Sequence, residues 1–175
     1  TINHLKTTGK FLSGRKLDSK PDLFLGAAVN PFVPPFEQRA LRLLKKHRAG
    51  ASFFQSQYCF DISRFESFLL LLLELTNGSP PPVLVGVGPL RSARFARWLR
   101  ENVPGVAIPD HIINQIEKYP EKEQQKAGIE ACVKIVEGVK NLTGVAGIHI
   151  MAHNWESSVS EIVEATGLTK TGRNN

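Results

Sequence analysis

The sequence predicts an α/β fold built from parallel βα repeats, and three observations lead to this prediction. Four short runs are almost continuously apolar, as strands are when both faces of a parallel sheet are buried. A segment with apolar residues at helical spacing follows each run. The chain has 175 residues, whereas a complete (β/α)8 barrel needs about 250. Four repeats therefore form either an open α/β layer or a partial TIM (β/α)8 barrel that another half completes.

The first repeat follows a polar, basic and glycine-containing segment, 1–22, which we expect to be the end of a helix and a linker. The apolar run LFLGAAV at 23–29 predicts the first strand, and Asn30, followed by proline, ends it. Residues 34–48 include a proline suited to a first turn and have one apolar face, so they predict a helix. Gly50 is the kind of residue that commonly follows a helix end.

The second and third repeats have the same plan. Residues 51–57 predict a strand, and Asp61 is placed to cap a helix over 62–75. An Asn-Gly pair and three consecutive prolines then predict a turn that belongs to neither neighbouring element. The run PVLVGVG at 82–88 predicts the third strand, after which Ser92 is placed to cap another helix.

The last repeat comes after a longer interval that has no obvious strand. Apolar spacing predicts a short helix over 110–118 and a long one over 121–140. Residues 143–151 predict the fourth strand, and 159–166 predict a final helix that Gly167 ends.

These elements divide the chain into three segments: a linker at 1–22, half of a barrel at 23–168 and a frayed tail at 169–175. The chain begins with Thr1 rather than Met, so we expect a trimmed chain or a piece of a longer one. A half barrel has two unpaired strand edges. We therefore expect a partner that closes it, either the missing N-terminal barrel half or a second copy in a homo-oligomer.

Composition and charge are those of a soluble globular protein, with 42% hydrophobic and 22% charged residues. The net charge of +6 comes from basic residues spread over several helices, so we expect an anionic small ligand and no nucleic acid. No apolar run has the length of a bilayer, so we expect no membrane partner.

Neither the cysteines nor the histidines have the spacing of a metal site. Cys59 and Cys132 are far apart and lack a CxxC pattern, which is typical of packed thiols in a reduced, cytoplasmic protein. His149 and His153 lie on a strand and its exit, where a separation of four does not bring side chains together as it does on a helix. We therefore expect no metal.

Several short motifs occur in a fixed order: GAAVNP at 26–31, AGASFFQSQ at 49–57 with FD at 60–61, GVGPLRS at 86–92, VPGVAIPD at 103–110, GIE at 128–130 and GIHI at 147–150. Together they resemble the C-terminal half of the methylenetetrahydrofolate reductase family, including the form fused to homocysteine methyltransferases. Any one motif alone is weak, whereas the ordered set is specific. The resemblance covers residues 23–168.

The resemblance implies a flavin enzyme on a (β/α)8 barrel, with the four strands here as the fifth to eighth. Such an enzyme passes a hydride from NAD(P)H to FAD. It then reduces 5,10-methylenetetrahydrofolate to 5-methyltetrahydrofolate, in one-carbon metabolism and methionine biosynthesis. Active groups of barrel enzymes gather at the C-terminal ends of the strands, which is where this sequence places its polar residues.

The resemblance also implies substrate-binding residues at the strand ends. Gln57 matches a glutamine that binds the pterin ring, and an amide offers such a ring both donors and an acceptor. Alternatively, Gln57 forms hydrogen bonds only with nearby backbone. Gln55 points to the same side as Gln57 and is a second candidate for substrate binding, although it lies deeper and could instead be a polar group of an inner barrel layer. Ser92 lies next to the substrate face, although capping explains it equally. Trp155, whose ring could stack on a ligand, stands where many members carry an arginine.

Cofactor-binding residues are implied in the first repeat. Ala28 and Asn30 lie at the end of the first strand, where the family has flavin contacts. Lys46 matches a helix lysine that can meet the FAD phosphates, and a cation on a pyrophosphate is physically reasonable. An exposed lysine in a basic helix also needs no ligand at all.

The catalytic carboxylates of the family belong to early strands that the resemblance does not include. No catalytic residue is therefore assigned, and we expect the chain alone to be incomplete as an enzyme. Two other functions remain open. One is a non-catalytic half-barrel that binds a partner subunit or folate, and the other is a barrel methyltransferase that holds folate through the same glutamine.

Overall fold

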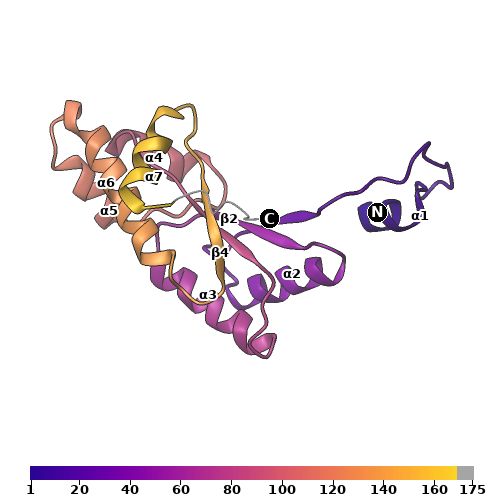
Figure 1. Ribbon diagram of the computed structural model, residues 1–175. Helices are drawn as coiled ribbons and strands as arrows, with labels where there is room; N and C mark the ends of the chain where they lie inside the picture. The colour runs from indigo at the N-terminus through magenta and orange to yellow at the C-terminus, as the bar shows by residue number, and fades with distance from the viewer. Residues whose placement is uncertain (169–175) are drawn as a thin grey trace.

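The computed structural model describes residues 1–168 and has a sheet of four parallel strands in the order β1-β2-β3-β4 (Figure 1). The strands are β1 (Gly26–Val29), β2 (Phe53–Tyr58), β3 (Val83–Val87) and β4 (Val145–Ile150). Each strand pairs with the next one along the chain. This sequential order is that of a (β/α)8 barrel, whereas a doubly wound sheet reverses its order at a switch point. The predicted fold class, parallel βα repeats of a partial barrel, is confirmed.

The helices follow the strands as predicted, with small differences at their ends. They are α1 (Ile2–Thr8), α2 (Glu37–Arg48), α3 (Ile62–Leu75), α4 (Ala93–Asn102), α5 (Asp110–Glu117), α6 (Gln124–Val139) and α7 (Ser157–Thr166). A 3-10 turn, η1 (Glu121–Glu123), forms the start of the predicted long helix. The first strand begins at Gly26, three residues later than predicted. The frayed tail predicted at 169–175 lies outside the described residues.

Two predicted side-chain caps are confirmed. Asp61 Oδ1 accepts a hydrogen bond from Arg64 N at 2.9 Å, and Ser92 Oγ accepts one from Phe95 N at 3.0 Å. Each cap satisfies one of the backbone donors that a helix start leaves without a partner. Both helices therefore begin shortly after the C-terminal end of a strand, which keeps the connections short. We call the C-terminal end of a strand, together with the residues that directly follow it, its mouth.

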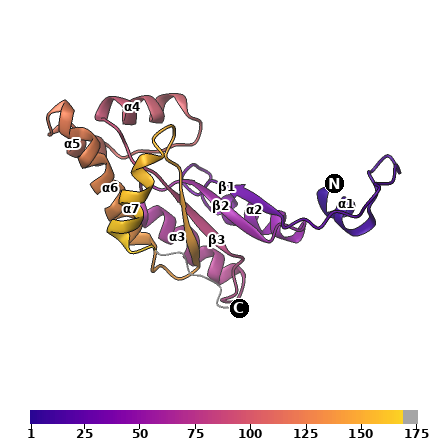
Figure 2. The ribbon, with the colours of Figure 1, turned by 45° about the horizontal axis from the view of Figure 1, so that its top comes forward.

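The sheet is covered by helices on one face only. Along β2 the burial alternates: Phe54, Ser56 and Tyr58 are buried, whereas Phe53, Gln55 and Gln57 are half-buried. Successive side chains of a strand point to opposite faces, so the two glutamines share the less covered face. We call it the open face. At the N-terminus of the chain, the helix α1 and the loop that follows it lie away from the sheet (Figures 1 and 2).

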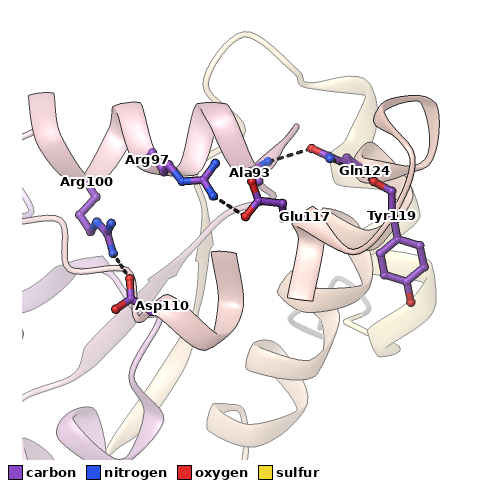
Figure 3. Close-up of polar contacts among 7 residues, drawn as sticks. All are labelled: Ala93, Arg97, Arg100, Asp110, Glu117, Tyr119 and Gln124. Carbon is purple, nitrogen blue, oxygen red and sulfur yellow. Dashed lines mark hydrogen bonds and ion pairs between the residues drawn. The ribbon is translucent and has the colours of Figure 1, made fainter. Parts of the chain in front are cut away.

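The long segment between α4 and β4 is tied to α4 by polar contacts (Figure 3). Arg100 Nη1 pairs with Asp110 Oδ1 at 2.7 Å, and Arg97 pairs with Glu117. Gln124 Oε1 accepts from Ala93 N at 3.0 Å, beside the cap that Ser92 provides. The ion pairs are solvent-exposed and individually weak. Together with the buried face of α5, these contacts hold α5 and α6 against the helix that follows β3.

Close contact between α6 and the mouth of β3 requires a glycine. A Cβ atom at Gly128 would overlap the carbonyl oxygen of Leu90, which belongs to the backbone and cannot swing away. At Gly147, by contrast, a Cβ would lie 3.0 Å from a methyl group of the flexible Leu84 side chain.

We predict that Gly128→Ala lowers the free energy of unfolding by about 1–3 kcal/mol, because helix and loop must separate to admit the methyl group. The measurement is urea unfolding of the full polypeptide. Gly147→Ala is the control and should cost clearly less. Equal losses in the two variants would contradict the packing argument.

Candidate functional site

A cavity of about 780 Å³ lies over β1, β2 and the end of β4, beside α2. The open face of the sheet and the end of β4 supply one part of its lining, namely Ala28, Gln55, Gln57, His149 and Met151. The helix α2 supplies another part, namely Arg39, Arg42, Lys45 and Lys46. The cavity therefore has neutral hydrogen-bonding groups in one region and cations in another.

A β-bulge shapes the part of the cavity around Gln57. The register between β2 and β3 shifts between Gln55 and Tyr58. The buried hydroxyl of Ser56 compensates for the interrupted ladder, because it accepts from Gly86 N at 2.8 Å and donates to Gln57 O at 2.8 Å. Bulges re-aim side chains and are common beside active sites.

The Gln57 amide has one end held and one end free. Its Oε1 accepts a hydrogen bond from Tyr58 N at 3.0 Å, which is the backbone contact considered as an alternative. Within residues 1–168, Nε2 has no hydrogen-bond partner, and neither end of Gln55 has one. The held oxygen orients the amide, so Gln57 offers a ligand a donor.

Asn30 has both ends of its amide occupied by backbone. Nδ2 donates to Gly105 O at 2.9 Å, and Oδ1 accepts from Phe32 N at 3.0 Å. Asn30 thus joins the mouth of β1 to the loop after α4 while also lining the cavity. Its flavin contact remains a prediction, and such a contact would have to compete with these bonds or use the backbone.

Lys46 reaches from α2 to the mouth of β1. Its Nζ donates to Ala28 O at 2.6 Å. Because β1 is an edge strand, this carbonyl has no neighbouring strand to bond with in the described residues. The contact places an ammonium group directly beside Ala28, another predicted cofactor-binding residue. The structure therefore brings Ala28, Asn30, Lys46, Gln55 and Gln57 together in one cavity.

Ser92 and Trp155 are not among the residues that line this cavity. Ser92 is a helix cap and lines a separate hollow of about 460 Å³ with Arg91, Phe95 and Trp98. Trp155 is half-buried and packs against the core, and its carbonyl accepts from Ser158 N. Their predicted substrate contacts remain predictions.

Sequence reasoning missed two features of the cavity. His149 was considered only as a metal ligand, yet it lines the cavity on the open face, and its Nδ1 is buried with no hydrogen-bond partner in the described part of the chain. Arg42 was not singled out, although it lies one helical turn before Lys46. The sequence held a sign of each. Alternation along the fourth strand determines the face of the sheet on which His149 lies, and the i, i+4 spacing puts Arg42 on the same helix face as Lys46.

Buried thiols are present but are not nucleophiles. Burial raises the pKa of Cys59 and that of Cys132 to about 12, so both stay protonated near neutral pH. Burial also raises the pKa of Tyr58, whose hydroxyl donates to Met151 O at 2.9 Å. Among residues 1–168, no group of three His, Cys, Asp or Glu side chains is arranged to hold a metal ion. No helix in that range has the length and apolarity needed to cross a membrane.

The fold and the cavity define the class of protein: a partial (β/α)8 barrel with a polar cavity on the open face of its sheet. A family model described as methylenetetrahydrofolate reductase matches residues 23–167. The chain belongs to the methylenetetrahydrofolate reductase family.

Two relatives extend this comparison. A "probable methylenetetrahydrofolate reductase (NADPH)" from Caenorhabditis elegans is 27% identical over 143 residues, which are 81% of this chain and 21% of that protein. A structure from Clostridium thermocellum has a TM-score of 0.63 at 15% identity, over 95% of this chain and 67% of that one. It is described as an uncharacterized protein that binds two copies of 5-methyl-5,6,7,8-tetrahydrofolic acid. The chain spans about a fifth of the curated relative, and the structural likeness shows the fold.

We predict that both cysteines react with a thiol-specific disulfide reagent at pH 8 only after unfolding. In the folded chain their pKa of about 12 leaves very little thiolate, whereas an unfolded cysteine has a pKa near about 8.5. The measurement is the rate of thiol release with and without denaturant. Rapid reaction of a thiol in the folded protein would contradict the assignment.

We predict that Ser56→Ala lowers the free energy of unfolding by about 1–3 kcal/mol, because it leaves the buried Gly86 N–H without an acceptor. Ser67→Ala, which removes an exposed hydroxyl on α3, is the control. Denaturant unfolding of the two variants gives the comparison. A Ser56→Ala loss no larger than that of the control would show that the hydroxyl does not stabilise the bulge.

Proposed function

We propose that this chain supplies the folate- and flavin-binding half of a flavin-dependent reductase. The reaction is the reduction of 5,10-methylenetetrahydrofolate to 5-methyltetrahydrofolate, with NAD(P)H as hydride donor, in one-carbon metabolism and methionine biosynthesis. The observation that carries the proposal is the single cavity in which Gln57 and the cations of α2 occur together. A ligand with a polar ring and an anionic group matches such a lining.

Gln57 supports folate as the ligand. Its oxygen is held by Tyr58 N, so the amide has one orientation and presents its NH2 group to the cavity. A pterin ring has acceptor atoms on its edge that this donor can bind. Family membership and the folate named for the Clostridium thermocellum structure point to the same ligand class.

The helix α2 supports FAD as the cofactor. Arg39, Arg42, Lys45 and Lys46 line the cavity, and Glu37 is the acidic residue of the helix. Such a cluster suits a pyrophosphate, because guanidinium and ammonium groups make strong charge-assisted hydrogen bonds to phosphate oxygens. Lys46 would hold a phosphate at the mouth of β1. Bound FAD would supply the hydride carrier between the nicotinamide and the folate.

Proton chemistry needs groups that this cavity does not have. Among the described residues, its lining includes neither Asp nor Glu. A general acid would therefore come from another segment, which we propose to be the N-terminal barrel half or a partner copy placed against β1. The chain would then bind and orient ligands while the complementary half carries out the proton transfer.

The same observation favours a second candidate, a non-catalytic half-barrel that binds folate or a partner subunit. A cavity with donors and cations but without a carboxylate can bind a ligand without turning it over. The two candidates differ in their requirement for flavin and NAD(P)H. A methyltransferase would instead show methyl transfer without a flavin spectrum.

The test is to purify the chain together with the complementary barrel half and to record the visible absorption of the complex and its folate-dependent oxidation of NAD(P)H. We predict a flavin spectrum together with turnover. Gln57→Ala should weaken folate binding about tenfold, and Lys46→Ala should weaken FAD binding about tenfold, as expected when a charged or oriented hydrogen bond is lost. Calorimetric titration with each ligand measures the two affinities.

Matched controls use exposed residues outside the cavity lining. Gln38→Ala on α2 controls for Gln57, and Lys118→Ala after α5 controls for Lys46. Both should bind ligands like the unaltered protein. Folate binding without flavin and without turnover would instead support the non-catalytic candidate. Absence of binding to either ligand would contradict both.

A further inference from the structure

His149 lies on the same face of the sheet as Gln57 and close to the same level. It belongs to β4 and is in register with Gly86 of β3. The strand β3 separates it from β2, on which Gln57 lies beside the bulge. Both side chains line the cavity of about 780 Å³. Two polar side chains from strands on either side of β3 therefore face one space.

The Nδ1 atom of His149 has no hydrogen-bond partner within residues 1–168, although it is buried from solvent. A buried polar atom without a partner costs free energy, and native proteins leave few of them. Because Nδ1 is buried, a ligand in the cavity does not reach it. The other ring nitrogen, Nε2, and the Nε2 atom of Gln57 also have no hydrogen-bond partner within residues 1–168, and neither of them is buried. Both atoms are therefore accessible to a ligand in the cavity.

The strand between them carries no side chain at this level. A Cβ atom at Gly86 would lie 2.5 Å from Ser56 O, 2.6 Å from the Met151 methyl and 2.9 Å from Gln57 O. The Met151 methyl group therefore lies over Gly86 and forms an apolar surface between the two polar residues. A flat ring can rest on a thioether of this kind, because methionine sulfur and methyl groups make favourable contacts with aromatic rings.

We propose that His149 is a second ring-binding residue, which bonds through Nε2 to the end of a bicyclic heterocycle opposite the end bound by Gln57. Neighbouring strands are about 4.8 Å apart, so the backbones of β2 and β4 are separated by about 10 Å. A bicyclic ring that lies across β3 can hydrogen-bond to side chains on both sides. Gln57 offers a donor, and the imidazole nitrogen offers a donor or an acceptor according to its tautomer.

This assignment rests on the proposed function, since the ring is taken to be the pterin of a folate. It adds a specificity-determining residue on the opposite side of the ring. A ring must then offer a hydrogen-bonding group to Gln57 at one end and to His149 at the other. A site with Gln57 alone would require only one such group. Ligands with one polar end would leave either His149 or Gln57 without a partner and would bind less well.

The experiment measures binding of 5-methyltetrahydrofolate and of 6-methyltetrahydropterin to the full polypeptide by calorimetry. His149→Phe keeps a ring but removes the hydrogen bond, so we expect it to lower the affinity for each ligand about tenfold. His149→Gln places an amide near the position of Nε2 and should recover part of the loss. In the unaltered protein, the imidazole ¹⁵N resonance of His149 should shift when ligand is added.

His111→Phe, at an exposed position on α5, is the matched control and should leave both affinities unchanged. Thermal unfolding shows whether each variant is folded, and the His149→Gln measurement keeps the test valid if His149→Phe does not fold. Unchanged affinity in the His149 variants, or an unshifted ¹⁵N resonance, would overturn the role of His149 and leave the proposed function standing. If the unaltered protein binds neither ligand, the proposed function itself fails.

Discussion

The structure depends on the parallel pairing of four consecutive strands. Because every strand runs in the same direction, all four carboxyl ends meet at one edge of the sheet, and the residues that follow them share one region. The helices pack on one face and bury residues such as Phe54 and Leu72. The other face remains available, and the polar groups that the chain does not bury there line the cavity. One geometric constraint thus produces both the core and the cavity.

The site also requires a local exception to that regular pairing. The shifted register between β2 and β3 interrupts the ladder next to Gln57, and the hydroxyl of Ser56 supplies the hydrogen bond that the ladder lacks there. Without a side chain at this level, Gly86 lets the bulged backbone and the Met151 methyl come close. The strand is regular where it stabilises the sheet and irregular where it meets the cavity. Such departures are expected where a fold gives up local regularity for a site.

Much of the fold could be predicted from the sequence, because apolar runs and caps are local signals. The caps of Asp61 and Ser92 and the identity of all four strands follow from them. The start of β1 could not be placed in this way. Phe24 belongs to the same apolar run, yet it lies outside the strand, largely exposed, and stacks on Phe53 with ring centroids 5.2 Å apart. In the site, the grouping of Gln57 with Asn30 was predictable from strand ends, whereas Lys46, on α2, was singled out only by the family resemblance. The role proposed for His149 depends on a glycine in the neighbouring strand.

The contact between Lys46 and Ala28 connects the free edge of the sheet with the cavity. A carbonyl on an edge strand can accept from a neighbouring strand or from a side chain, and here the ammonium group of Lys46 takes it. A strand paired with β1 would supply a backbone donor for that oxygen, so Lys46 would lose this partner. Its charge would then be best satisfied by an anion in the cavity, beside Arg42. Closure of the barrel would give Ala28 O a backbone donor and leave Lys46 without a partner, whereas a bound phosphate would pair with Lys46 and leave Ala28 O without one. Each event would supply the partner that the other removes, so the two would favour each other. Reciprocity of this kind is what thermodynamic linkage requires of two events that share one group.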